Sequence, residues 1–76
     1  MKTYGIETIY SPNGGRVLGV KLTRYGKVYG SVQVNGGLGK QSEADEVAAY
    51  WSLRGQAKSL GATHVRILDK QERVDD

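Results

Sequence analysis

The feature that most constrains the fold is an alternation of residue types with period two across residues 3–34, followed by a helical period across residues 43–60. Segments 3–10, 16–24 and 27–34 each place larger apolar side chains on every second position, which is typical of strands with one buried face. We expect the buried faces to consist of Tyr4, Ile6, Thr8, Tyr10, Leu18, Val20, Leu22, Val28, Val32 and Val34, with Gly30 among them.

Turn signals separate these three segments. Residues 11–15, Ser-Pro-Asn-Gly-Gly, combine a turn-starting proline with glycines that accept positive φ. The dipeptide Tyr25-Gly26 leaves only two residues between the second and third segments, which predicts a tight antiparallel hairpin. The three strands are therefore expected to form an antiparallel meander.

A single helix is predicted after the glycine-rich segment 35–39. Ser42 can cap its first turn, and the Asp45 side chain three residues on can accept a hydrogen bond from the backbone N–H of Ser42 in a capping-box arrangement. Gly61 is placed to end the helix in the left-handed conformation. We expect the helix to cover one face of the sheet and to shield Trp51. The residues assigned to its buried stripe are Val47, Tyr50, Trp51, Leu53, Ala57 and Leu60.

Segment 63–68 predicts a fourth strand, and residues 71–76 form a polar tail that we expect to fray. The predicted fold is thus a single α+β domain over residues 1–70 with element order βββαβ. One sheet face remains open. We expect that face to carry Lys21, Thr23, Lys27, Tyr29, Ser31 and Gln33.

Composition limits the function classes. The 76 residues contain no cysteine, which excludes disulfides and thiolate metal sites. The N-terminal residues contain no apolar run, so we expect no signal peptide, no membrane span and a cytoplasmic location. Gly36–Ser42 only partly matches a phosphate-binding loop, and His64 has no recognisable nucleophile or metal-ligand partner. We therefore expect no cofactor and no metal.

The charge is unevenly distributed. Residues 1–42 carry six lysines and arginines against one acid, Glu7, whereas residues 43–76 carry five against seven acids. Lysines and arginines interleaved with tyrosines suit nucleic-acid binding, because the basic side chains neutralise phosphates and the tyrosine rings stack on nucleobases. The predicted binding surface consists of Arg16, Lys21, Arg24, Tyr25, Lys27, Tyr29, Gln33 and Lys40.

The predicted helix and last strand resemble the corresponding part of ribonuclease H proteins. The residues that carry this resemblance are Glu46, Leu60, Gly61, Val65, Ile67 and Asp69. It implies a catalytic glutamate at Glu46 and a catalytic aspartate at Asp69. The first strand has Glu7 where that family has an aspartate, and Asp69 lies one residue early, so we expect a protein that is not an enzyme.

Two further resemblances bear on function. Small truncated versions of the ribonuclease H fold occur in HicB-type antitoxins and in phage-encoded proteins. The pattern of residue types in segments 26–37 and 42–49 also resembles the strand–strand–helix part of double-stranded-RNA-binding domains. The favoured function is a small module that binds nucleic acid. The alternative is an inhibitor or accessory protein of a phage or mobile element, like an anti-CRISPR, that binds a host protein complex; a homodimer is also considered.

Overall fold

The computed structural model describes residues 1–34 and 40–75, and within the helix it describes side chains from residue 44 onward. The α+β class is confirmed, with the helix between the third and fourth strands. The elements are β1 (Thr3–Tyr10), β2 (Val17–Arg24), β3 (Lys27–Gln33), α1 (Lys40–Ser59), β4 (His64–Ile67) and β5 (Lys70–Arg73).

The strands form one mixed sheet in the order β3-β2-β1-β4-β5. The predicted meander of β1, β2 and β3 is antiparallel, but β4 pairs parallel to β1 and makes β1 the central strand. The predicted four-strand order is incomplete, because residues 71–73 lie in a fifth strand rather than in a polar tail. β5 pairs antiparallel to β4, and Val74, directly after it, is buried in the core.

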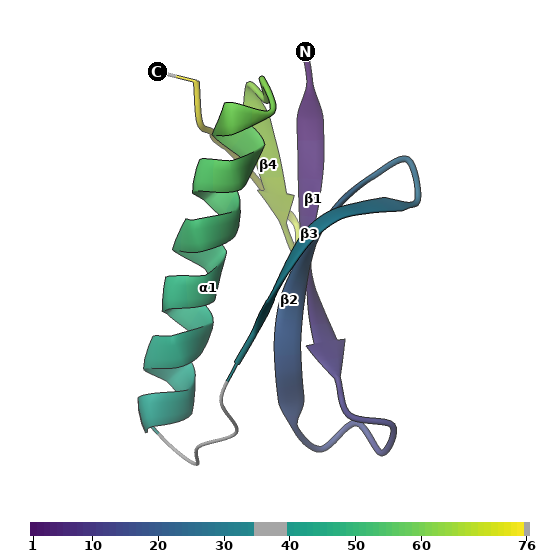
Figure 1. Cartoon of the computed structure of the whole chain (residues 1–76), viewed down its shortest axis with the longest axis vertical. Helices are drawn as coiled ribbons and strands as arrows, with labels where there is room; N and C mark the ends of the chain where they lie inside the picture. Colours follow the sequence, from purple (N-terminus) through teal and green to yellow (C-terminus); the bar gives the residue numbers. More distant parts are fainter. Residues whose placement is uncertain (35–39, 76) are drawn as a thin grey trace.

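The molecule has two layers, with α1 on one face of the sheet and the opposite face open (Figure 1). Alternate residues of the central strands point towards the helix, as the period of two predicts. The core consists of Tyr4, Ile6, Val20, Leu22, Val34, Ala49, Leu53, Ala57, Ala62, Val65 and Val74.

The buried face of α1 is narrower than predicted. Ala49, Leu53 and Ala57, spaced four residues apart, are buried, and Tyr50 beside them is half-buried. Trp51 was expected under the sheet but is 65% exposed. At about 100° per residue it lies roughly 200° around the helix from Leu53, so both cannot face the sheet. Val47 and Leu60, also assigned to the stripe, are exposed as well.

The end of α1 confirms the role of Gly61. Its φ is 87°, and its N–H donates to the carbonyl of Lys58 at 3.0 Å, while the N–H of Ala62 donates to the carbonyl of Ala57 at 2.9 Å. This bond pair is the Schellman arrangement. The helix begins at Lys40, two residues before the serine predicted to cap it. Most of the segment compared with a phosphate-binding loop lies outside the described residues, because these exclude residues 35–39.

Two β-bulges change which side chains face the helix. Between β2 and β3, Leu22 pairs with Gly30 but Thr23 pairs with Val28, which leaves Tyr29 as the extra residue. A bulge reverses the alternation beyond it. Val28 was assigned to the core, but it is 52% exposed and shares the open face with Thr23.

The second bulge affects the start of β2. Ile9 pairs with Gly19 but Tyr10 pairs with Val17, so Leu18 is the extra residue. Val17 is partly buried against the core, whereas Leu18, assigned to the core, is exposed. Tyr10 is also exposed, because β1 ends beside this bulge.

Candidate functional site

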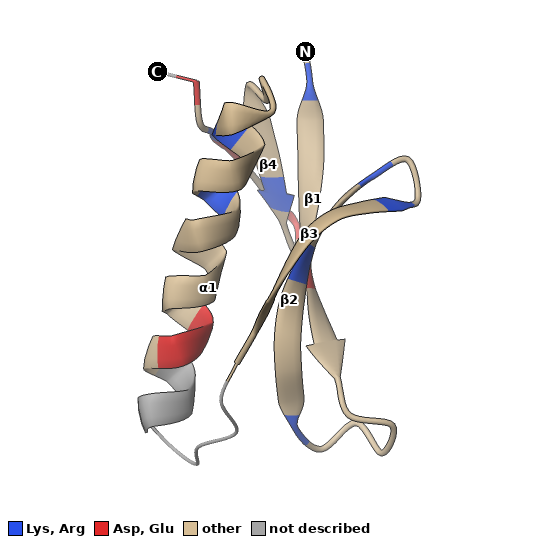
Figure 2. Ribbon diagram, viewed as in Figure 1, with Lys and Arg blue, Asp and Glu red and all other residues tan. Residues whose placement is uncertain are grey.

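The structure divides the predicted binding surface. Four of its eight residues lie together where β2 turns into β3, namely Arg24, Tyr25, Lys27 and Tyr29. Figure 2 shows Lys and Arg on this hairpin end, on the last turns of α1 and on β4, whereas Asp and Glu lie on α1 just after its grey first turn. The hairpin end therefore lies in the cationic part of the molecule.

The side chains at this end alternate between cations and rings. The Arg24 guanidinium carbon lies 4.6 Å from the Tyr25 ring centroid and 5.6 Å from the Tyr4 centroid. The Lys27 ammonium lies 5.3 Å from the Tyr29 centroid. The rings of Tyr4 and Tyr29 meet edge to face at 5.2 Å. We call Lys2, Tyr4, Arg24, Tyr25, Lys27 and Tyr29 the hairpin cluster.

The position of Tyr29 corrects the sequence-based assignment. It was expected on the open face, but the bulge turns its ring to the helix side, against Tyr4. There it lines a hollow with residues of α1, including Ser52, Gln56 and Ser59. Its ring remains 40% exposed, so the hairpin cluster wraps around the end of the sheet rather than lying on one face.

Tyr25 is the most exposed ring of the cluster, at 90%. It occupies the first position of a two-residue turn in which Tyr25 has φ 53° and Gly26 has φ 77°. Positive φ at both positions is what a type I′ hairpin turn requires, and Asn or Gly satisfies it far better than tyrosine. Hairpin stability therefore does not explain a tyrosine at this position.

Two cations of the cluster lack an acidic partner among the described residues. No described carboxylate lies within ion-pair distance of Arg24 or Lys27. Lys2, which is not among the eight predicted surface residues, directly precedes β1 and joins the cluster. Its ammonium lies 5.6 Å from the Tyr4 centroid and donates to the carbonyl of Leu60 at 2.7 Å. Its position two residues before Tyr4 could have indicated this, because the alternation of the strand, continued to Lys2, places both side chains on the same side.

The other four predicted residues lie elsewhere. Lys21 points to the open face, where its ammonium is 3.9 Å from Glu7. Arg16 precedes β2 and Gln33 ends β3, both at the end of the hairpin opposite to its turn. The side chain of Lys40 lies outside the described residues.

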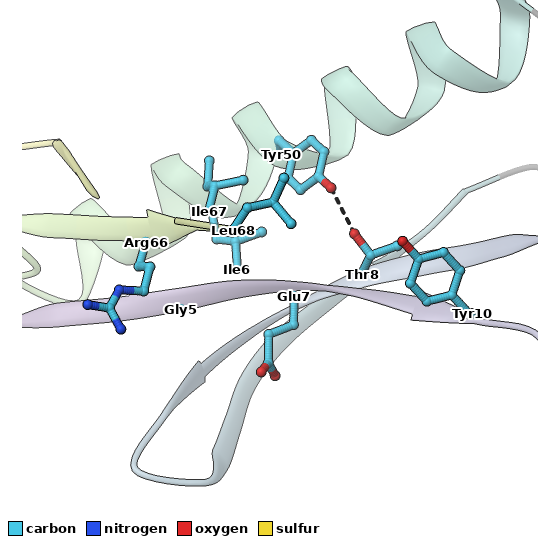
Figure 3. A pocket seen from close by; sticks show the side chains of 9 residues that line it. All are labelled: Gly5, Ile6, Glu7, Thr8, Tyr10, Tyr50, Arg66, Ile67 and Leu68. Carbon is cyan, nitrogen blue, oxygen red and sulfur yellow. Dashed lines mark hydrogen bonds between the residues drawn. The ribbon is translucent and has the colours of Figure 1, made fainter. Parts of the chain in front are cut away.

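A second feature is the unpaired edge of β1. β4 pairs only with Thr3–Ile6, and no other described segment pairs with this side of residues 7–10. An apolar hollow lies beside this edge, lined by Ile6, Tyr10, Tyr50, Ile67 and Leu68 among others (Figure 3).

Tyr50 lines this hollow from α1. Its hydroxyl donates to Glu46 at 3.0 Å. It also lies 2.8 Å from the Thr8 hydroxyl (Figure 3). Since the single phenolic proton goes to the carboxylate, the Thr8 hydroxyl donates to Tyr50. Burial raises the pKa of Tyr50; the bond to Glu46 raises it further and the bond from Thr8 opposes the shift.

The acidic residues singled out by the ribonuclease H resemblance do not gather. Glu46 is bonded to Tyr50, and Asp69 lies in the exposed turn between β4 and β5. Within residues 1–34 and 40–75, no three His, Asp or Glu side chains are placed to hold a metal ion. His64 Nδ1 lies 2.8 Å from the Thr63 hydroxyl, which gives the ring a local partner.

In the described residues, no helix is long and apolar enough to cross a membrane. Comparisons with protein-family models, with curated proteins and with solved structures found nothing that matches this chain.

Proposed function

We propose that this protein is a non-catalytic module that binds single-stranded nucleic acid through the hairpin cluster. The observation that carries the proposal is Tyr25, a ring 90% exposed at a turn position that tyrosine fits poorly, with the Arg24 guanidinium 4.6 Å from its centroid. A strained residue in a cluster of cations points to function rather than to stability.

The chemistry of the cluster suits a single strand. Arg24 and Lys27 supply positive charge for phosphates, and Tyr25 offers a free ring face on which a nucleobase can stack. Tyr4 is buried and cannot contact a base, but its ring supports both Arg24 and Tyr29. The cluster thus has an inner supporting ring and outer binding groups.

The decisive variant is Tyr25→Asn. Asparagine before glycine suits the turn better than tyrosine, so this variant keeps or raises stability while it removes the ring. We expect its affinity for a fluorescein-labelled oligothymidylate of about 15 nucleotides to fall by roughly 5- to 150-fold, the equivalent of about 1–3 kcal/mol. Fluorescence anisotropy at about 50 mM salt measures the binding.

Charge variants supply the matched control. Lys27→Gln should weaken binding and lower the log–log salt slope by about 0.7 for each phosphate that the side chain no longer neutralises. Arg16→Gln makes the same charge change at the far end of the hairpin and should alter the affinity little. Equal affinity of wild type, Tyr25→Asn and Lys27→Gln, or no binding by the wild type, would refute the proposed function.

A second candidate function is binding to a host protein, as an inhibitor or accessory factor. The observation that favours it is the unpaired edge of β1 beside an apolar hollow. An extended peptide of a partner could pair with residues 7–10 as an added strand and place an apolar side chain in the hollow. Edges of this kind are otherwise a liability that proteins cover.

Leu68, which is 84% exposed and lines the hollow, provides the test. A partner that wild type and Lys27→Gln both capture from host lysate, and that Leu68→Asp does not, would support this second function. Capture that Leu68→Asp leaves unchanged would refute it. Sedimentation velocity of the purified wild type identifies the case in which the partner is a second copy of the chain.

A further inference from the structure

Gly5 forms the floor of a polar hollow on the open face of the sheet. It lies in the central strand, paired with Thr23 of β2 on one side and Arg66 of β4 on the other. A Cβ on Gly5 would lie 3.1 Å from the Thr23 hydroxyl oxygen, so a side chain here would occupy the space. The lining residues are Thr3, Gly5, Thr23, Arg24, Tyr25, Arg66 and Gln71.

The lining consists of groups that bind anions. The lining residues carry two guanidinium groups, three hydroxyls and one amide, and none of them has a carboxylate. Among the described residues, neither Arg24 nor Arg66 has a carboxylate within ion-pair distance. Glu7, two residues along β1 from Gly5, has Lys21 at 3.9 Å. The positive charge at the hollow is therefore not compensated by any described carboxylate.

The hollow is continuous with the hairpin cluster, because Arg24 and Tyr25 line it. A strand whose base stacks on Tyr25 would bring its backbone to this face of the sheet. Arginine is suited to the next contact, since its planar guanidinium can donate two parallel hydrogen bonds to one phosphate.

We propose that this hollow holds one phosphodiester group of the bound strand, with Arg66 as its main donor from β4 and Gly5 as the residue that leaves room for it. The proposal rests on the function proposed above and deepens it, because it adds a backbone site to the base-stacking ring.

Two variants test the site by different means. Gly5→Val fills the hollow without any change in charge, and valine is well tolerated in strands. Arg66→Gln removes the main donor at an exposed position. Each should weaken binding of the labelled oligothymidylate by about tenfold, the range expected for a charge-assisted hydrogen bond, and Arg66→Gln should also lower the salt slope by about 0.7.

Each variant has a control. Gly55→Ala adds a methyl group to a glycine of α1 whose Cβ would meet nothing within 4 Å, and it should bind as the wild type does. Lys70→Gln on β5 makes the same charge change as Arg66→Gln, away from the hollow. Far-UV circular dichroism confirms that all four variants are folded.

An abasic oligomer with the same number of phosphates separates this site from the ring. On that probe, Gly5→Val and Arg66→Gln should still weaken binding, whereas Tyr25→Asn should not. If Tyr25→Asn weakens oligothymidylate binding but Gly5→Val and Arg66→Gln do not, the phosphate site is wrong and the proposed function stands. If the wild type binds neither oligomer, both are wrong.

Inorganic phosphate distinguishes a strand from a free anion. It should compete with the oligomer better than chloride of equal ionic strength, and Arg66→Gln should abolish the difference. If phosphate raises the melting temperature of the wild type but not of Arg66→Gln, while no oligomer binds, the assignment to a nucleic-acid strand is overturned.

Discussion

Truncation of Leu53 to alanine tests which face of α1 packs on the sheet. Leu53 is fully buried, and its Cδ2 atom lies 3.8 Å from the position that a Cβ on Gly30 would take. Its buried neighbours on the helix are Ala49 and Ala57. Gly30, Ala49 and Ala57 have no long side chain that could move into the space. The Gln56 side chain lies over Gly30, but moving into the apolar cavity would bury its amide without a partner, so the cavity should persist. We therefore expect a cost in the upper part of the usual range of about 2–5 kcal/mol.

Trp51→Ala is the matched comparison on the same helix. It removes a larger side chain, but one that is 65% exposed and whose main described interaction is with the Arg54 guanidinium, 4.9 Å from the ring centroid. Removal of this cation–π pair should cost about 0.5–1 kcal/mol. The largest side chain of the helix should thus matter less for stability than the smaller leucine.

Urea unfolding followed by far-UV circular dichroism measures both variants, since this signal does not depend on the tryptophan. A domain of this length is expected to have about 4–11 kcal/mol of stability, so Leu53→Ala could leave the chain partly unfolded in water. Leu53→Val, which removes one carbon at a cost of about 1 kcal/mol, then gives a complete transition. The packing described here is wrong if Trp51→Ala lowers the unfolding free energy as much as Leu53→Ala does.

Two further predictions concern the edge of the hollow beside β1. Burial raises the pKa of Tyr50 from 10.0, so the folded state holds the phenolic proton more tightly than the unfolded state does. The protonated phenol therefore stabilises the folded state below pH 10, and this stabilisation is lost as the pH rises through the folded-state pKa. Urea midpoints should therefore fall more steeply above pH 10 in the wild type than in Tyr50→Phe; equal slopes would contradict the shift. Leu68 has φ 55° and is 84% exposed, so Leu68→Gly should raise the unfolding free energy by up to about 1 kcal/mol. A lower melting temperature for Leu68→Gly would show that its side chain has a stabilising contact.

The first four strands and the single helix follow from periodicity, and the end of the helix follows from the glycine at position 61, because each depends on residues close in sequence. The fifth strand was missed, because Lys70–Arg73 has no alternation of apolar and polar residues. The two bulges could not be predicted in this way, since a bulge is a property of two paired strands and no sequence feature identifies the extra residue. Leu18 and Tyr29 were each assigned to the wrong face for this reason. Trp51 was misplaced for another reason: with apolar residues on most sides of α1, the pattern alone did not fix which stripe faces the sheet.

The same distinction between local and distant pairing explains which half of the candidate site was predictable. Arg24, Tyr25 and Lys27 were found together because a two-residue turn holds them. Gly5 and Arg66 are 61 positions apart, and they meet only because β4 runs parallel to β1 in the register that opposes them. No local pattern specifies that register; it depends on how α1 returns the chain to the far side of the central strand. In the sequence Arg66 therefore resembles an ordinary exposed strand residue, and only the parallel pairing places it at the hollow that Arg24 and Tyr25 also line.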